Sequence, residues 1–210
     1  MIAITYIGHA TTFIEWDGQT IFTDPHFSPR TFFLKRRSPF TCDLGQLPQP
    51  ECVLLSHTHF DHLDIRSYKY LSCHIPIVVP KKVSPLIHNI LANPVIELPH
   101  GASWISPHGF KITATKARHR SGRYSGIRYT SSNSYLIEKN DKTVYFAGDT
   151  GYHDEFKKLG QDKNIHVALL PIGAYKPRWF MKYRHMNPEE ALQAFRDLQA
   201  KYMIPIHWGT

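Results

Sequence analysis

At 210 residues the chain is long enough to bury a hydrophobic core of its own, and it is predicted to form a single domain over residues 1–210. Its hydrophobic share of 42% and charged share of 20% are typical of a globular protein, and its apolar runs fall short of the roughly 20 residues that a membrane-spanning helix needs. The formal net charge of +8 favours anionic partners, such as a phosphorylated substrate, nucleic acid or an anionic membrane surface, without deciding among them.

The first half of the chain is predicted to consist mainly of strands, because short β-branched and aromatic runs alternate with turn residues. These runs lie at residues 2–8, 11–17, 19–25, 52–56 and 74–80. Asp17-Gly18 is a favoured hairpin turn. Residues 27–40 are rich in Pro, Arg and Phe and show no clean period, so they are predicted as a loop. Residues 84–94, between prolines, predict a short helix.

Strands continue in the second half at residues 102–106, 110–119, 134–140, 143–149, 167–173 and 203–210. A helix is predicted from Asp154 to Leu159, ending at Gly160. The clearest helix covers residues 187–202, with Asn187 as N-cap, Pro188 at the first position and an acidic first turn. Many strands and few helices, in two successive halves, predict a layered α+β sandwich.

The stretch SHTHFDHLD, directly behind the apolar run CVLL, carries an unusual concentration of metal-ligand side chains. His57 and His59 on a tight loop can point at one ion, and Asp61 and His62 can then face a neighbouring one. Imidazole and carboxylate ligands of this kind suit zinc, iron or manganese. The alternative, a polar loop with solvated histidines, is disfavoured because the pattern is rare by chance.

Two metal ions need about seven ligands, and three further candidates follow apolar runs downstream. His119 comes after KITATKAR, Asp149 after TVYFAG and His207 after MIPI. A carboxylate at Asp149 could bridge both ions. Singly, each is a weak signal, because a histidine at a strand end is often only a structural hydrogen-bonding group. As an ordered set behind the cluster they predict a two-metal site.

The segments SHTHFDHLD, ARH, AGDTG and IHWGT, in this order, resemble the metallo-β-lactamase superfamily. A longer set, TDPHFS, KRRSPF, AGDTGY, PIGAYKPRWFMKYRHMNPEEA and HWGT, resembles the N-acylphosphatidylethanolamine-hydrolysing phospholipase D group and its bacterial relatives. The resemblance covers nearly the whole chain from Gly8 onwards. It implies a four-layer αβ/βα sandwich with a binuclear metal site at one edge.

The resemblance also implies a role for each site residue. His57, His59 and His119 would hold one ion, Asp61, His62 and His207 the other, and Asp149 would bridge them. His185, in YRHMNPEE, matches the histidine that this group places against the substrate phosphate. The alternative for His185 is a residue beside a helix start with no role.

The implied reaction is that of a metal-dependent phosphodiesterase of the phospholipase D type. A hydroxide bridging two divalent cations would attack the phosphodiester of an N-acylphosphatidylethanolamine-like lipid. Asp61 could orient the hydroxide or accept its proton, and His185 could steady the phosphoryl oxygens or the leaving group. Zinc is the first expectation for both ions, with iron and manganese as alternatives.

Basic and aromatic residues near these motifs suggest substrate contacts, although solvated or core positions explain them about as well. Lys176, Arg178, Lys182 and Arg184 flank His185, and Trp179, Phe180 and Met181 could line an acyl-chain groove. Phe32, Phe33 and Leu34 beside Lys35, Arg36 and Arg37 would suit an anionic lipid surface. The expected partners are a phospholipid or other small phosphodiester, with peripheral membrane contact as an option. No nucleic acid is expected, and the sequence predicts no oligomeric state.

Cellular context is indicated by the cysteines and by the opening residues. Cys42, Cys52 and Cys73 are an odd number without paired spacing, which predicts reduced, mostly buried thiols. The opening residues lack the basic lead of a signal peptide. Both features favour a cytoplasmic protein, with any membrane contact peripheral.

Two departures from the resembled group bear on function. The stretch ARHRSGRYSG around His119 has arginines and glycines where the lipid-cleaving members have an aromatic residue and a cysteine, so a different substrate mouth is expected. Related chains continue for tens of residues beyond the last ligand, so the sandwich is expected to be truncated at its C-terminus. Two alternatives therefore stay open: a lactonase or other hydrolase on the same site, including a nuclease, and a catalytically weak metal-binding fragment.

Overall fold

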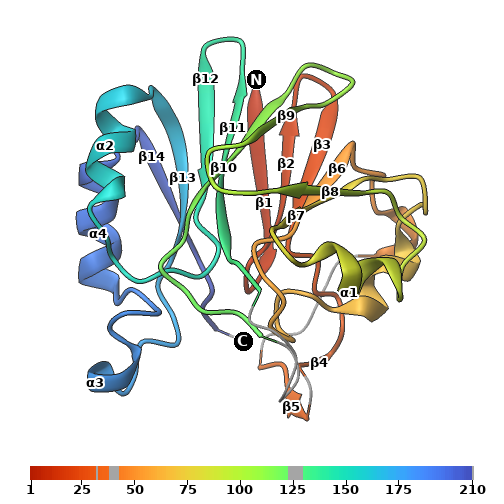
Figure 1. The fold of residues 1–210 in the computed structure, drawn as a ribbon, viewed down its shortest axis with the longest axis horizontal. Coiled ribbons are helices and arrows are strands. Elements are labelled where there is room, and N and C mark those ends of the chain that lie inside the picture. The colour runs from red at the N-terminus through yellow and green to blue at the C-terminus, as the bar shows by residue number, and fades with distance from the viewer. Residues whose placement is uncertain (32, 38–42, 123–129, 210) are drawn as a thin grey trace.

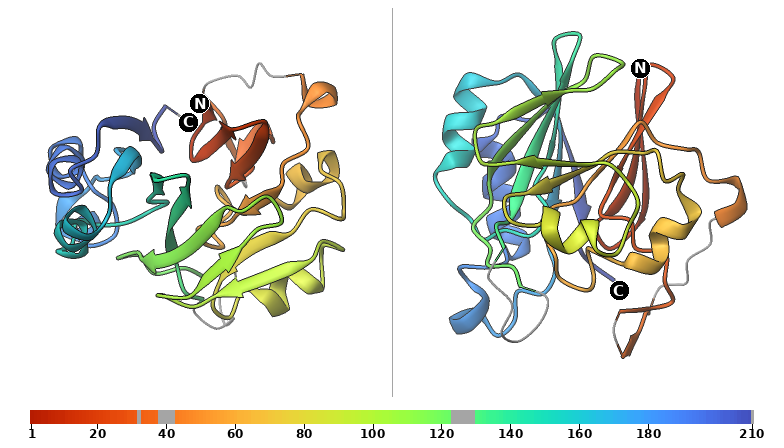
Figure 2. Two further views of the ribbon diagram at one scale, coloured as in Figure 1. Left: turned by 90° about the horizontal axis from the view of Figure 1, so that it is seen from above. Right: turned by 45° about the vertical axis from the view of Figure 1, so that its right-hand side comes forward.

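The computed structural model describes residues 1–31, 33–37, 43–122 and 130–209. Two six-stranded sheets pack face to face, and helices cover their outer faces (Figure 1, Figure 2). The first sheet has the order β1 (Ile2–Gly8), β2 (Thr11–Trp16), β3 (Gln19–Thr23), β6 (Cys52–Leu54), β7 (Ile77–Pro80), β8 (Val95–Leu98). The second has the order β14 (Tyr202–Ile206), β13 (Ile165–Pro171), β12 (Lys142–Phe146), β11 (Asn133–Lys139), β10 (Lys111–Lys116), β9 (Ser103–Ile105).

The remaining elements are short. The helices are α1 (Ser84–His88), α2 (Glu155–Asp162), α3 (Arg178–Met181) and α4 (Pro188–Asp197), with two 3-10 segments at η1 (Leu44–Gln46) and η2 (Ile65–Tyr70). A small hairpin joins β4 (Arg30–Thr31) to β5 (Leu34–Lys35). In the described part of the chain, no helix is long and apolar enough to cross a membrane.

Three hydrophobic clusters separate the four layers. Between the sheets, side chains such as Trp16, Ile21 and Phe110 are fully or almost fully buried. The outer face of the first sheet packs against η2 and α1, and the outer face of the second packs against α2 and α4. The predicted α+β, four-layer sandwich is therefore confirmed. Burial of apolar area on this scale is the main force that holds such layers together.

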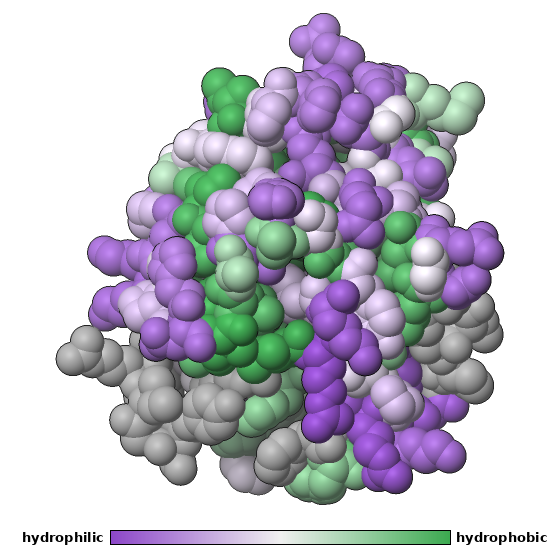
Figure 3. Space-filling model, turned by 90° about the vertical axis from the view of Figure 1, so that its right-hand side faces the viewer, coloured by the Kyte–Doolittle hydropathy of each residue, from purple (hydrophilic) through white to green (hydrophobic). Residues whose placement is uncertain are grey.

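The face on the side of α1 is chemically mixed. Figure 3 shows hydrophilic residues spread over most of it, with hydrophobic residues gathered in its lower half. This face is therefore not a continuous apolar surface.

Several local predictions are confirmed. Asp17 and Gly18 both have positive φ, which is what a two-residue type I′ hairpin turn requires. Asn187 caps α4 in a reciprocal capping box with Glu190.

Other boundaries were wrong. The 84–94 helix ends at His88 and is followed by strand β8, which was not predicted. The 27–40 loop contains the β4–β5 hairpin, and residues 178–181 form the unpredicted helix α3. The 187–202 helix ends at Asp197, because the chain turns there into β14.

The second helix was predicted to end at Gly160, but α2 continues to Asp162. Gly160 is buried because α2 crosses α4 there: a Cβ at this position would lie 2.1 Å from the carbonyl oxygen of Asp197. Glycine is therefore needed at this position because α4 packs closely against it, and not because the helix ends there.

The thiol prediction holds for one cysteine and fails for another. Cys52 is buried in β6, and burial raises the pKa of its thiol. Cys73 is exposed. Cys42 lies outside the described residues.

Candidate metal centre and active site

The site lies at one end of the sandwich because strands of both sheets run toward it. β3 and β6 are parallel in the first sheet, and β12, β13 and β14 are parallel in the second. Parallel neighbours end at the same sheet edge, where α/β and layered proteins place their ligands. All eight predicted site residues are brought together there: His57, His59, Asp61, His62, His119, Asp149, His185 and His207.

The first ligand group contains His57, His59, His119 and Asp149, whose ligand atoms all lie within 4.8 Å of one another. Nδ1 of His59 is 2.9 Å from Nε2 of His57 and 3.1 Å from Nε2 of His119. Three imidazole nitrogens thus converge beside one carboxylate. This is the group predicted for the first ion.

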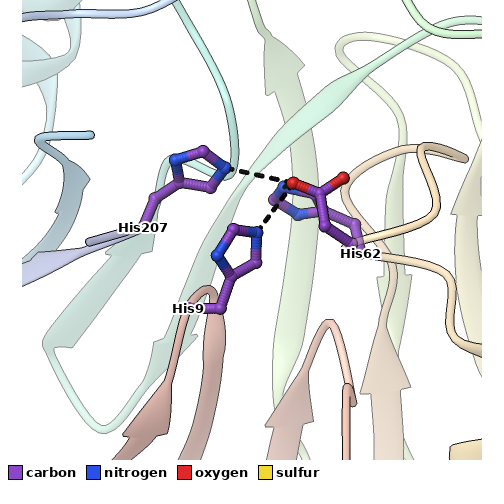
Figure 4. Close-up of side chains that lie close together, drawn as sticks. His9, His62 and His207 are labelled. Atoms are coloured by element: carbon purple, nitrogen blue, oxygen red, sulfur yellow. Dashed lines mark hydrogen bonds and ion pairs between the residues drawn. The ribbon is translucent and has the colours of Figure 1, made fainter. Parts of the chain in front are cut away.

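The second group contains Asp61, His62 and His207, as predicted, together with His9, which was not. Oδ2 of Asp61 lies 3.4 Å from Nε2 of His207 and 3.7 Å from Nε2 of His62. Figure 4 shows the imidazoles of His9, His62 and His207 converging from different segments of the chain. Its dashed lines mark the contacts of His9 and His207 with the Asp61 carboxylate.

Asp149 lies between the two groups. Its Oδ2 is 3.3 Å from Nε2 of His62 and 3.8 Å from Nε2 of His57, and its Oδ1 is 3.2 Å from Nε2 of His207. The preceding residue, Gly148, has a φ of +57° and would clash with Ser56 if it carried a side chain. A small residue at that point lets the Asp149 carboxylate reach both groups, so it can bridge two cations.

His185 lies against the same carboxylate, outside these two groups, and it forms a third candidate ligand group with Asp149 and His207. Its Nδ1 is 3.7 Å from Oδ2 of Asp149, and its ring centroid is 5.0 Å from that of His119. The segment that carries it is fixed by Arg178, which donates to the His185 carbonyl at 2.9 Å and to Glu190 at 2.7 Å. Arg178 therefore positions His185, and its guanidinium is already engaged within the protein.

Buried hydrogen bonds orient the imidazoles. Asp24, fully buried at the end of β3, accepts from Nδ1 of His62 at 2.6 Å and from the hydroxyl of Ser56 at 2.5 Å. Because Ser56 donates to Asp24, its oxygen can accept from Nδ1 of His57, 2.9 Å away. Nδ1 of His119 faces the carbonyl of Arg184 at 3.0 Å. Each of these rings therefore presents Nε2 to the site, as outer hydrogen bonds do in metal centres.

The electrostatics of the site also fit cations. Burial alone would raise the pKa of Asp149 and of Asp61, but the surrounding histidines hold both well below the usual range. Burial, together with neighbouring imidazoles, keeps the pKa of His57 well below its usual value, and burial lowers that of His119 to about 4. Ionised carboxylates and neutral imidazoles are the forms that coordinate metal.

Charge around His62 points the same way. Burial would lower the pKa of this ring, but Asp149, Asp61 and Asp24 raise it well above its usual value. The surrounding carboxylates thus attract positive charge to this point.

Several buried atoms of the site make no hydrogen bond among the described residues: Nε2 of His62, Oδ1 of Asp149, Nδ1 of His185 and both ring nitrogens of His207. Buried polar atoms rarely lack partners, and divalent cations would supply them.

Two functional residues were missed by the sequence interpretation, His9 and Asp24. His9 directly follows β1, which ends at Gly8, and Asp24 directly follows β3, which ends at Thr23. The signal that singled out His119, Asp149 and His207, a polar residue behind an apolar run, therefore applied to both. Asp24 stands in the quoted segment TDPHFS but was given no role.

Two basic hollows flank the site. One, of about 400 Å³, adjoins His119 and is lined by Arg118, His119, Arg120, Trp179, Phe180, Tyr183 and Arg184. The other, of about 300 Å³, adjoins Asp61 and is lined by His9, Thr31, Leu34, Lys35, Arg36, Arg37 and Asp61. Trp179 is 84% exposed and Leu34 62% exposed, so the core-packing alternative is wrong for both. Phe32 and residues 123–126 of the ARHRSGRYSG stretch lie outside the described residues.

Comparisons with known proteins assign the chain to a family. The family model for the beta-lactamase superfamily domain matches residues 19–208. The chain is 35% identical to N-acyl-phosphatidylethanolamine-hydrolyzing phospholipase D 1 of Caenorhabditis elegans, over 98% of this chain and 63% of that protein. It is 32% identical to a UPF0173 metal-dependent hydrolase of Exiguobacterium sp., over 99% of this chain and 86% of that protein. The chain thus spans less than two thirds of the nematode relative.

A solved structure supports the same assignment. Igni18, a metallo hydrolase from the archaeon Ignicoccus hospitalis, superposes with a TM-score of 0.76 at 26% identity, over 99% of this chain and 82% of that one. The matched family model and the shared fold lead to one conclusion, and the His/Asp clusters that could hold metal ions agree with it. The chain belongs to the beta-lactamase superfamily, and it shares its fold with metal-dependent hydrolases.

Proposed function

We propose that this protein is a binuclear metal-dependent phosphodiesterase of the phospholipase D type, acting on an N-acylphosphatidylethanolamine-like lipid or a smaller anionic diester. The observation that carries the proposal is His185. It contacts the shared carboxylate Asp149 at 3.7 Å while standing outside both three-histidine groups. Because neither of those groups needs it, His185 could instead steady a phosphoryl oxygen of the substrate.

The ligand groups would be divided as the sequence predicted. His57, His59 and His119 would hold one cation, Asp61, His62 and His207 the other, and Asp149 would join them. When bound, two divalent cations lower the pKa of water and neutralise charge on the oxygens of an in-line displacement at phosphorus. Zinc, iron and manganese all accept these ligands.

The protein's own groups would divide the remaining work. The side chain of Asp61 is 27% exposed, against 2% for Asp149, so Asp61 is the site carboxylate that solvent and substrate reach. It can orient water and accept a proton. His185, whose pKa burial lowers, is neutral near pH 7 and can donate one ring N–H to a phosphoryl or leaving oxygen.

The basic hollows support an anionic substrate. Three arginines lie beside the His119 end of the site, and two of them stack on aromatic rings: Arg118 on Tyr183 at 4.4 Å and Arg184 on Phe180 at 4.6 Å. Guanidinium groups recognise phosphate and carboxylate, and exposed rings receive apolar or planar groups. The chemistry favours a phosphodiester over a neutral ester, and peripheral contact with an anionic membrane remains part of the proposal.

The test is product analysis. Metal-loaded protein is incubated with N-acylphosphatidylethanolamine in vesicles, and N-acylethanolamine and phosphatidic acid are measured by mass spectrometry. We expect both products, their loss in His59→Ala, and a rate about 100-fold lower or more in His185→Ala with metal content unchanged. No product from a protein shown to hold two ions would reject this lipid. Turnover of bis(p-nitrophenyl) phosphate in the same sample would then keep the diester class and point to a smaller substrate.

A further inference from the structure

The turn between β1 and β2 places a histidine in a conformation that histidines seldom adopt. His9 has a φ of +57°, in the left-handed region, and it follows a register shift between Tyr6 and Gly8. Such a conformation is uncommon for a non-glycine residue and costs free energy; turns use it, and strained examples cluster at functional sites. The turn therefore directs this side chain to a particular place.

That place is the second ligand group. The His9 side chain is only 11% exposed, and its Nε2 lies 2.8 Å from Oδ2 of Asp61. Its carbonyl accepts from the backbone N–H of His207 at 2.6 Å, and the two rings are 4.1 Å apart. Its ring is also 5.2 Å from that of His62. One residue thus touches three members of the group, as Figure 4 shows for the imidazoles.

Asp61 is the member that most needs such support. It stands on a loop, and it is the more exposed of the two site carboxylates. A carboxylate that rotates toward water presents its oxygens poorly to an ion. A donor on one oxygen fixes the rotation while leaving lone pairs for coordination.

We propose that His9 is a positioning residue of the second metal group: its Nε2–H donates to Asp61 Oδ2, and its backbone carbonyl anchors the segment that carries His207. The role concerns metal binding and does not depend on which diester is the substrate. His9 joins the first sheet's opening hairpin to a centre otherwise built from the His57–His62 loop and the second sheet.

Metal affinity tests the proposal directly. His9→Gln keeps an N–H donor on a side chain of similar reach, and His9→Leu removes the donor. His74→Leu, at an exposed histidine, is the matched control. Zinc affinity of both equivalents is measured by chelator competition, and the Co²⁺-substituted proteins are compared by absorption spectroscopy.

We expect His9→Leu to weaken the second equivalent about 10- to 100-fold and leave the first unchanged. His9→Gln should stay within a few-fold of the wild type and keep its Co²⁺ spectrum, as should His74→Leu. Equal losses in Gln and Leu variants would overturn the proposal, because they would make His9 a ligand. Unchanged affinity in both would overturn it as well.

A double-mutant cycle covers the case in which His9→Leu folds poorly. In an Asp61→Asn background the donor at position 9 no longer faces an ionised carboxylate. His9→Gln and His9→Asn should then differ little in their affinity for the second ion. In the wild-type background His9→Asn, which cannot place its amide where Nε2 lies, should be the weaker binder. The same difference between the two variants in both backgrounds would contradict the proposal.

Discussion

Arg178 donates a hydrogen bond of 2.9 Å to the backbone carbonyl of His185, and the same guanidinium pairs with Glu190 at 2.7 Å. The bond ties the segment that carries His185 to the first turn of α4, whose capping box also uses Glu190. A basic residue that the sequence offered as a substrate contact therefore acts through the backbone of the candidate catalytic residue.

Arg178→Gln should lower kcat about tenfold, because losing a hydrogen bond to a charged group costs roughly 1.5–3 kcal/mol and loosens His185. KM and metal content should change little. Steady-state kinetics on a soluble diester measure this, with Lys182→Gln in the same stretch as the control. A rise in KM with kcat unchanged would instead make Arg178 a substrate-binding residue.

Asp24→Asn should weaken metal binding about 10- to 100-fold, because the buried carboxylate that orients His62 would lose its charge. The effect should appear in chelator competition as loss of the second equivalent. Its control is Asp43→Asn, which removes the carboxylate that caps η1. Wild-type affinity in Asp24→Asn would show that the orientation of His62 does not depend on this bond.

Gly160→Ala should destabilise the fold by about 2 kcal/mol, although alanine normally favours a helix. The added Cβ would lie 2.1 Å from the Asp197 carbonyl oxygen and would push α2 away from α4. Gly45→Ala, where the nearest atom is 3.4 Å away, should change stability by less than about 0.5 kcal/mol. Urea unfolding of the two variants measures the difference, and equal stabilities would refute this account of the packing.

His153 should make the fold less stable in mild acid. Its ring stacks on Phe156, and burial, with Lys116 and Arg118 nearby, lowers its pKa to about 4. The unfolded chain, with a pKa of about 6.5, takes up the proton first as pH falls. The contribution of neutral His153 to stability is therefore fully present above about pH 6.5. It is lost progressively as the pH falls from about 6.5 to about 4.

His153→Gln should accordingly lose less stability than the wild type between about pH 7 and about pH 5. Urea unfolding of both proteins in excess chelator measures it, so that proton competition at the metal site does not contribute. Parallel pH curves for the two proteins would show that His153 has no part in the acid sensitivity.

The sequence was sufficient for the fold class and for naming seven candidate ligands that the structure gathers in one place, because the His57–His62 loop and the three later residues come after strands. It was insufficient for His9 and Asp24, although both follow strands. His9 lies in a hairpin turn, and local pattern does not say at which sheet edge a turn will lie. That depends on the pairing of β3 with β6, a long-range contact. Strand β8 was not predicted, because its sequence, VIEL, is short and its residues are only partly buried.

The binuclear centre is tested most directly by the metal content of the purified chain after zinc loading and dialysis, measured by elemental mass spectrometry. We expect two equivalents per chain in the wild type. We expect one in His59→Ala and one in His207→Ala, since these substitutions remove a candidate ligand from different groups. One equivalent or none in the wild type, or loss of the same ion in both variants, would contradict a binuclear centre bridged by Asp149.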